Sequence, residues 1–282
     1  MEAINAHQLC DSTLREMNNV LSESLGADVI FINSAIYPPL DDRFRVEIEK
    51  IIARGKPKNS KLFVILETNG GSIETVERLV VVMRKHYREV HFIIPSHAFS
   101  AGTVLALSGD KIFMDYYSVL GPIDPQYLDD NGDSLLPGAG YLAKFEELTK
   151  TINNAEHPGS CRAEMSYLIK KFDPAKLFHI EQAIEHGETL IGEWLPKYKF
   201  KNWRQTSSGK RVTKAMREER AKSIASILGE ATKWHSHGRG ISKAELEGDE
   251  IKLTIDDFGD DVELNRNVRN YHGLAIDLAL KK

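Results

Sequence analysis

The sequence predicts an α/β fold built on a parallel sheet. Three apolar runs of strand length, at 27–32, 62–66 and 90–95, alternate with segments whose apolar residues recur at helical spacing. The run Leu62–Leu66 is continuously apolar, which is typical of a strand covered on both faces. At 282 residues, of which 41% are hydrophobic, the chain can bury one large core and still form a helical appendage.

The first half of the chain alternates strands with helices. An N-terminal helix is expected over 11–25, where four apolar residues recur at helical spacing before Gly26. The elements expected after it are strand 27–32, helix 41–53, strand 62–66, helix 72–87, strand 90–95, helix 101–108 and strand 111–114. The short connections between these elements predict parallel strands joined by right-handed crossovers.

The character of the chain changes after Gln126. Helical patterns dominate there, and we expect helices over 139–153, 175–194 and 212–229. These patterns divide the chain into three parts. They are a helical arm over 1–26, an α/β core over 27–155 and a mostly helical extension over 156–282.

Composition narrows the class of protein. The net charge of -4 provides no basic field that would attract nucleic acid, and we interpret the short basic stretch 197–210 as a solvated loop with aromatic anchors. Cys10 and Cys161 are too few for a disulfide framework, which favours a reducing, cytoplasmic location. No segment has the ~18 consecutive apolar residues of a membrane span. No ligand cluster has zinc-like spacing, so neither a metal nor another cofactor is expected.

Two turns rich in small residues follow consecutive predicted strands. Thr68–Gly71 comes after strand 62–66, and Phe99–Thr103 comes after strand 90–95. The carboxyl ends of parallel strands meet at one edge of a sheet, where ligands bind in open α/β folds. Each turn alone is more often structural, as a helix cap or a tight turn. Together they indicate acyl-transfer chemistry.

The residue types in these turns fit the needs of amide or ester cleavage. Such cleavage requires an exposed hydroxyl, backbone N–H groups aimed at the developing oxyanion, and a proton acceptor. Ser100 supplies a hydroxyl at a turn, and the amide of Ala101 is one expected oxyanion donor. Gly71, together with Gly70, is the expected second source, because glycine lets backbone approach a substrate closely.

Four motifs carry a resemblance to a known family. They are Glu67–Ser72, Ala98–Thr103, Leu107–Ile112 and Leu120–Gln126. Together they resemble the serine dehydrogenase proteinase family, a branch of the Clp-protease/crotonase fold. The resemblance is continuous over about residues 28 to 150. It implies a ββα spiral core, a nucleophile at Ser100 and peptidase activity.

The resemblance also implies the remaining catalytic groups. The family order of serine, aspartate and histidine places the aspartate at Asp124 and the histidine in the segment 234–241. His237 is our choice because it keeps the spacing of the motif, and His235 is the second choice. The sequence departs from the family at Asn69, where relatives commonly have proline before the glycine pair.

Lys144 is a rival base. Signal peptide peptidase A-type and stomatin-linked proteases resemble this core and use a Ser-Lys dyad, and Lys144 lies at a comparable distance downstream. A lysine base requires burial that lowers its pKa, and the neighbouring Glu146 and Glu147 would oppose that shift. His97, three residues before Ser100, is interpreted as a loop residue or a wall of the substrate cleft.

The sequence and the resemblance together lead to the hypothesis of a cytoplasmic serine endopeptidase. Its partners would be a peptide or protein substrate and further copies of the chain, because this fold often assembles into homo-oligomers. Two alternatives stay open. One is a crotonase-type acyl-CoA enzyme, which would share the oxyanion turns without needing a serine. The other is a catalytically silent scaffold or partner-binding subunit.

Overall fold

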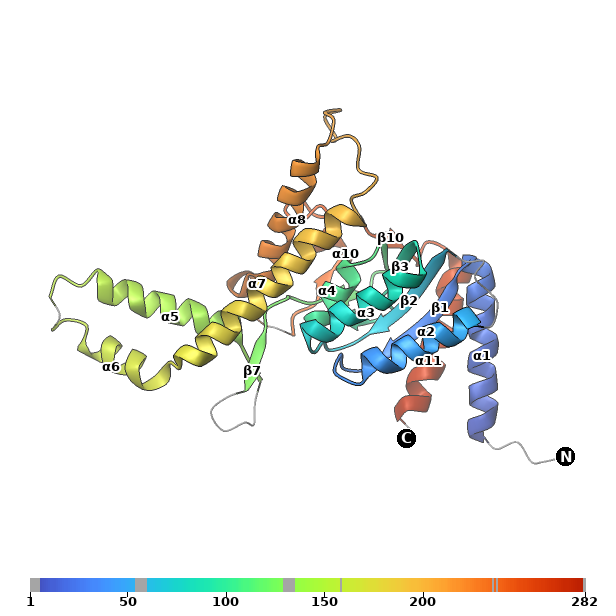
Figure 1. Cartoon of the computed structure of the whole chain (residues 1–282), viewed down its shortest axis with the longest axis horizontal. Coiled ribbons are helices and arrows are strands. Elements are labelled where there is room, and N and C mark those ends of the chain that lie inside the picture. The colour runs from blue at the N-terminus through green and yellow to red at the C-terminus, as the bar shows by residue number, and fades with distance from the viewer. Residues whose placement is uncertain are drawn as a thin grey trace.

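The computed structural model describes residues 6–53, 60–128, 135–157, 159–234, 236 and 238–280. Figure 1 shows a central sheet with helices on both faces, and further helices from the second half of the chain that project from this body.

The main sheet confirms the predicted parallel α/β architecture. Its five strands are parallel and lie in the order β1-β2-β3-β5-β10. They are β1 (Asp28–Asn33), β2 (Lys61–Glu67), β3 (Glu89–Ile93), β5 (Lys111–Met114) and β10 (Asp256–Asp257). In register, Leu62 of β2 lies between Asp28 of β1 and Val90 of β3. The first four strands match the predicted ones to within two residues at each end.

Helices cover both faces of this sheet. One face carries α2 (Leu40–Ala53), α3 (Ile73–His86) and α4 (Ala101–Leu107), and the other carries α1 (Ala6–Leu25) and α11 (Val262–Leu280). In strand β2, successive side chains point alternately to the two faces of the sheet. Leu62 and Val64 belong to the first core, whereas Phe63 and Ile65 belong to the second. This double burial explains the continuously apolar sequence of β2.

A second, smaller sheet lies beyond the ends of the main strands. It consists of β4 (His97–Ala98), β6 (Val119–Leu120) and β9 (Ile241–Ser242). β4 and β6 are parallel, and β6 and β9 are antiparallel. Strands of two residues have no sequence periodicity, so this sheet could not be predicted.

The second half of the described chain is mostly helical. Its remaining elements are β7 (Gln126–Leu128), β8 (Leu135–Pro137), α5 (Gly138–Asn153), α6 (Arg162–Lys171), α7 (Pro174–Lys197), α8 (Lys214–Gly229), α9 (Ala231–Trp234) and α10 (Lys243–Glu247). Figure 1 shows α5 and α6 projecting from the body, with α7 leading back to α8. Among the described helices, none combines the length and the apolar character that a membrane crossing needs.

The chain after residue 155 also returns to the α/β body. Leu190, Ile191 and Leu195 of α7 belong to the same buried cluster as the first face of the sheet. β9 joins the small sheet, β10 joins the main sheet and α11 covers the second face. The division of the chain at 155/156 stays a prediction, and any boundary there crosses a shared core.

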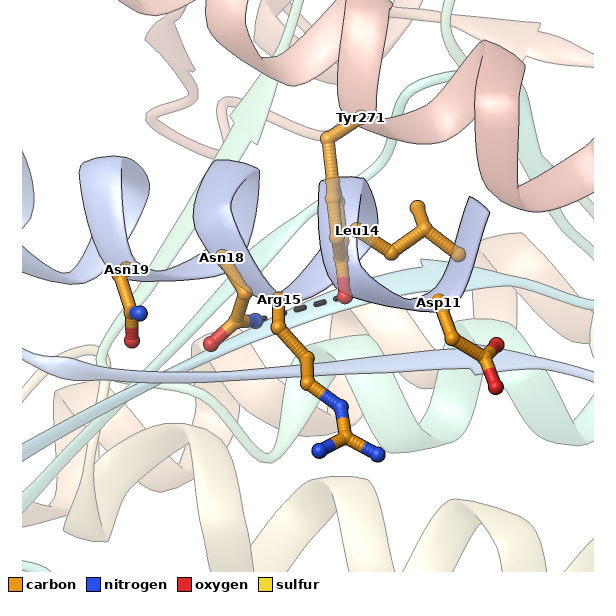
Figure 2. Close-up of a pocket in the computed structure, with 6 residues that line it drawn as sticks. All are labelled: Asp11, Leu14, Arg15, Asn18, Asn19 and Tyr271. Atoms are coloured by element: carbon orange, nitrogen blue, oxygen red, sulfur yellow. Dashed lines mark hydrogen bonds between the residues drawn. The ribbon is translucent and has the colours of Figure 1, made fainter. Parts of the chain in front are cut away.

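An open surface hollow of about 420 Å³ is lined by residues of α1 and by Tyr271 of α11 (Figure 2). Asn18 Nδ2 donates to the Tyr271 hydroxyl at 3.3 Å and to the Val29 carbonyl at 3.1 Å. One side chain of α1 is thus hydrogen-bonded to both α11 and β1. These bonds fix how the first and last described helices pack on the sheet.

A buried carboxylate fastens the segment after α7 to the body. Asp110, 9% exposed, accepts hydrogen bonds from Arg84 Nη1 at 2.7 Å, from the Val90 amide at 2.8 Å and from Lys201 Nζ. The Arg84 guanidinium also lies 3.5 Å from the centre of the Tyr198 ring. Burial by itself raises the pKa of Asp110, but the hydrogen bonds from Lys201 and Arg84 outweigh burial and hold that pKa below its ordinary value.

We expect Asp110→Asn to lower the free energy of unfolding by about 3 kcal/mol, because it leaves the buried Arg84 without its counter-charge. Asp249→Asn is the matched control, since Asp249 is fully exposed in its ion pair with Lys252 and should change little. Urea denaturation of the two variants and the wild type measures both values. Equal stability of Asp110→Asn and wild type would contradict the role of Asp110 in holding the segment after α7 to the body.

The same carboxylate makes stability depend on pH. Its folded pKa lies below the unfolded value of about 3.9, so the stabilisation is complete above that value and is lost as pH falls through the folded pKa. Wild type should therefore lose more stability than Asp110→Asn below about pH 4. Denaturation curves at a series of acidic pH values check the sign.

Candidate active site

Backbone hydrogen bonds join the two predicted turns. The Thr68 amide donates to the His97 carbonyl at 3.1 Å, and the Phe99 amide donates to the Thr68 carbonyl at 3.0 Å. Thr68 and Ala98 thus form a parallel bridge immediately before the glycine pair and the serine. The expectation that the ends of consecutive parallel strands meet at one edge is met here.

A third segment, which sequence analysis did not identify, completes this edge. The Ile36 amide donates to the Gly70 carbonyl at 2.8 Å, and the Ser72 amide donates to the Ile36 carbonyl at 2.8 Å. Ile36 follows β1 in the chain, so the ends of three neighbouring strands converge. The available signal was its position after the first predicted strand.

Ser100 has an unusual backbone conformation. Its φ of 52° and ψ of −119° lie outside the regions that L-residues favour, and among the described non-glycine residues only Lys252 shares a positive φ. Ser100 precedes α4, yet its side chain makes no capping hydrogen bond. Ser72 does cap α3, accepting from the Thr75 amide. Strained residues cluster at functional sites, and the structural explanation of Ser100 as a side-chain cap does not hold.

Gly70 lies directly against the serine turn. A Cβ at Gly70 would come 2.9 Å from the Ser100 Cβ and 2.8 Å from the Phe99 carbonyl oxygen, and its φ is +102°. Any side chain would therefore collide with the serine turn as well as strain the backbone. The Gly70 amide is already used, because it donates to Thr68 Oγ1 at 3.0 Å.

The amides of Gly71 and Ala101 are differently placed. Neither donates a hydrogen bond to any residue that the structure describes. Ala101 is the first residue of α4, where a helix leaves its N–H groups without helical acceptors. Each of the two turns thus has one open N–H group, Gly71 on the glycine turn and Ala101 directly after Ser100.

Thr103 locks the serine turn onto the small sheet. Its buried hydroxyl lies 2.8 Å from the Ala98 carbonyl oxygen and 2.9 Å from the Gly121 carbonyl oxygen, and it accepts from the Gly121 amide at 3.0 Å. Gly121 has no room for a side chain, because a Cβ would lie 2.5 Å from Phe99 Cδ1. The chain leading to Asp124 is thereby held beside the residue that precedes Ser100.

Asp124 is buried, with 2% of the residue exposed. It follows Ile123, whose amide donates to the Leu228 carbonyl at 3.0 Å near the end of α8. The backbone that carries Asp124 thus runs from the small sheet to the end of α8. Its role as the orienting acid stays a prediction.

The predicted bases His237 and His235 lie outside the described residues. The chain on either side of them is well fixed. Trp234 is buried and its Nε1 donates to the Ile227 carbonyl at 2.8 Å, while Ile241 pairs with Leu120 of β6.

The rival base Lys144 is a surface residue of α5. Half of its side chain is exposed, and its Nζ forms an ion pair with Glu147 Oε1 at 2.8 Å. A Ser-Lys dyad needs a buried amine, whereas this amine is solvated and paired. The geometry favours a base other than Lys144.

Two further contacts at this edge were not predicted. His97 Nε2 lies 3.0 Å from Asn69 Oδ1, and His272 Nε2 of α11 is hydrogen-bonded to Glu67 Oε2 at the end of β2. The hydrogen bond from His272 lowers the pKa of Glu67 despite its burial, and the nearby charges of His272 and His97 act in the same direction. The sequence signal for His97 was its nearness to Ser100, and His272 had none.

Two curated proteins are similar to this chain over part of its length. The chain is 40% identical over 73 residues to the uncharacterized protein MJ0137 of Methanocaldococcus jannaschii, covering 26% of this chain and 26% of that protein. It is 33% identical over 119 residues to the uncharacterized protein MJ1495 of the same organism, covering 42% and 40%. The chain therefore spans less than half the length of these relatives.

Solved structures of proteases also align with the chain. A mutant of the 1510-N membrane-bound stomatin-specific protease in complex with a substrate peptide aligns at 15% identity and a TM-score of 0.45, over 81% of this chain and 73% of that one. The ClpP protease catalytic domain from Plasmodium falciparum aligns at 12% identity and a TM-score of 0.32, over 43% and 63%.

A family model described as ClpP-like SDH-type serine proteinase matches residues 28–142. This segment contains both strand-end turns, Ser100 and Asp124. The resemblance inferred from the sequence is thus confirmed over residues 28–142, which match the ClpP-like SDH-type serine proteinases.

Proposed function

We propose that this protein is a serine peptidase that cleaves peptide bonds through an acyl-enzyme on Ser100. The observation that carries the proposal is the geometry around Ser100. A strained serine, not used as a cap, lies against Gly70 and precedes Ala101, and the amides of Gly71 and Ala101 are both open. The match of this segment to a family of serine proteinases supports the substrate class.

The reaction follows from these groups. Ser100 Oγ attacks the carbonyl carbon, its proton passes to a base, and the carbonyl π electrons move onto oxygen. The Gly71 and Ala101 amides then donate to that oxyanion. The base returns the proton to the leaving amine as the C–N bond breaks. Water, deprotonated by the same base, hydrolyses the ester to release the acid and restore Ser100.

Within this proposal the Gly71 amide is the better oxyanion donor of the glycine pair. The Gly70 N–H is already bonded to Thr68 Oγ1. Gly70 instead provides the space that lets the two turns approach each other. This division of roles refines the sequence-based assignment, which grouped the two glycines.

We propose His237 as the base and Asp124 as its orienting acid. The support is the antiparallel pairing of β6 and β9, in which Leu120 lies opposite Ile241. Asp124 comes four residues after Leu120, and the described residues 238–240 come directly before Ile241, so these two stretches of chain leave the pairing at the same end. Imidazole accepts and returns a proton near neutral pH without a large pKa shift.

Ser100→Ala should abolish peptidase activity without unfolding the protein, because it removes the nucleophile and little buried area. The measurement is labelling by a fluorophosphonate probe, with peptide mapping of the adduct and internal cleavage of an unfolded protein substrate. Ser24→Ala, at an exposed serine of α1, is the control and should label like wild type.

Three results would contradict the assignment of Ser100 as the nucleophile. They are an adduct at another residue, cleavage by Ser100→Ala above about one hundredth of wild type with a matched melt, and acyl-CoA turnover that survives the substitution. The last would favour a crotonase-type enzyme. A folded wild type that neither labels nor cleaves would indicate a silent scaffold.

Gly71→Ala should lower the labelling rate by about a hundredfold, since it displaces the amide that donates a hydrogen bond to the oxyanion of the transition state. A Cβ at Gly71 would lie 2.2 Å from the Ile36 carbonyl oxygen, so the turn must move. Gly140→Ala is the control, because a Cβ there meets no atom within 4 Å. Labelling kinetics and thermal melts on both variants test this. Wild-type kinetics in folded Gly71→Ala would contradict the donor role.

A base at His237 and a base at Lys144 lead to opposite expectations for two variants. If His237 is the base, His237→Gln should slow labelling by several orders of magnitude, whereas Lys144→Met should be nearly silent because it removes only a surface ion pair. Single-turnover labelling with the same probe compares the two variants. Rapid labelling of His237→Gln together with none of Lys144→Met would reverse the assignment.

A further inference from the structure

The side chains of Asn69 and His97 form a second link between the glycine turn and the serine turn. His97 Nε2 and Asn69 Oδ1 are 3.0 Å apart. With a carbonyl oxygen facing the ring, the imidazole must supply the proton, so Nε2–H donates to Asn69 Oδ1. The first link is the pair of backbone hydrogen bonds made by Thr68, the residue that precedes Asn69.

The imidazole itself is held from two further directions. Nδ1 of His97 lies 3.0 Å from Ser96 Oγ. The ring also packs against Phe99, with centroids 4.9 Å apart and planes 31° apart. His97 is therefore a fixed point on the chain that leads into Ser100. Both ring nitrogens are hydrogen-bonded to groups other than Ser100.

Asn69 is an exposed point of the glycine turn, and a side chain restrains it. Thr68 and Gly70 are both held by backbone hydrogen bonds, whereas Asn69 is exposed and its described contact is the one to His97. The next two residues, Gly70 and Gly71, have φ values of +102° and +153°, and glycine is the residue with the most conformational freedom to lose. Ile36 holds the Gly71 peptide from one side, and Asn69 controls how the glycine pair enters that peptide from the other.

We infer that Asn69 and His97 are a positioning pair that aligns the Gly71 amide with Ser100. This inference rests on the proposed peptidase function. Neither residue touches the reacting atoms. Their hydrogen bond limits the motion of one turn relative to the other, and a site of this kind needs its donors held within about 0.5 Å.

The test is a double-mutant cycle of Asn69→Ala and His97→Leu, measured by saturation kinetics of fluorophosphonate labelling. Each single variant should lower the maximal labelling rate about tenfold and leave the half-saturating probe concentration unchanged. The double variant should also be about tenfold slower, not a hundredfold, because both changes remove the same bond. His97→Gln, which keeps a donor at similar reach, should recover most of the rate.

Controls separate positioning from folding. His179→Leu, at an exposed histidine of α7, should label like wild type. Thermal melts of every variant are compared, and Asn69→Ala, at an exposed residue, tests the bond even if His97→Leu unfolds.

Several results would overturn the inference while leaving the peptidase intact. They are an unchanged rate in folded Asn69→Ala, multiplied losses in the double variant, and a His97→Leu loss above a thousandfold that Asn69→Ala does not share, which would make His97 a base. Failure of wild-type Ser100 to label would instead overturn the proposed function, and the inference with it.

Discussion

The site depends on the pair of backbone hydrogen bonds that Thr68 makes with His97 and Phe99. A parallel sheet brings the carboxyl ends of β2 and β3 to the same edge, but neighbouring strands alone do not place one turn against the next. The bridge at Thr68 does so, because it continues the pairing of β2 beyond the main sheet. Close contact between Gly70 and Ser100 then follows, and it is possible only because residue 70 has no side chain. The strain at Ser100 is tolerated because Thr103 and Gly121 hold the turn from the other side.

The last part of the chain stabilises this edge from outside. Arg269 of α11 is paired with the buried Asp115 and also donates to the Pro95 carbonyl, so it fixes the loop that leads to β4. His272 of the same helix is bonded to Glu67 at the end of β2. Two polar contacts from one helix therefore reach the chains that lead into both turns. α11 covers the apolar second face of the sheet with Leu264 and Val268, and its polar residues orient the site.

The regular elements of the core followed from local patterns. Strand β5, helix α2 and the C-terminal end of α1 lie where apolar periodicity placed them, because each is long or apolar enough to show its period, whereas α1 begins at Ala6 and not at residue 11. Helix α11 was not predicted. Its asparagines and Gly273 are poor helix formers, and it is helical because Leu264, Val268 and Tyr271 pack on the sheet. The two-residue strands β9 and β10 were also missed, because their pairing partners lie more than a hundred residues away.

The sequence by itself determined the parallel sheet, the two turns at one edge and Ser100 as the candidate nucleophile, because apolar periodicity and small residues at strand ends are local properties of the chain. Only the tertiary structure decided which groups surround that serine. It showed that the Gly70 amide is used internally, that Lys144 is solvated and that Asn69 is bonded to His97. These facts depend on hydrogen bonds and solvent exposure between segments distant in sequence. No local pattern records such contacts, since they exist only after the strand ends have been brought together.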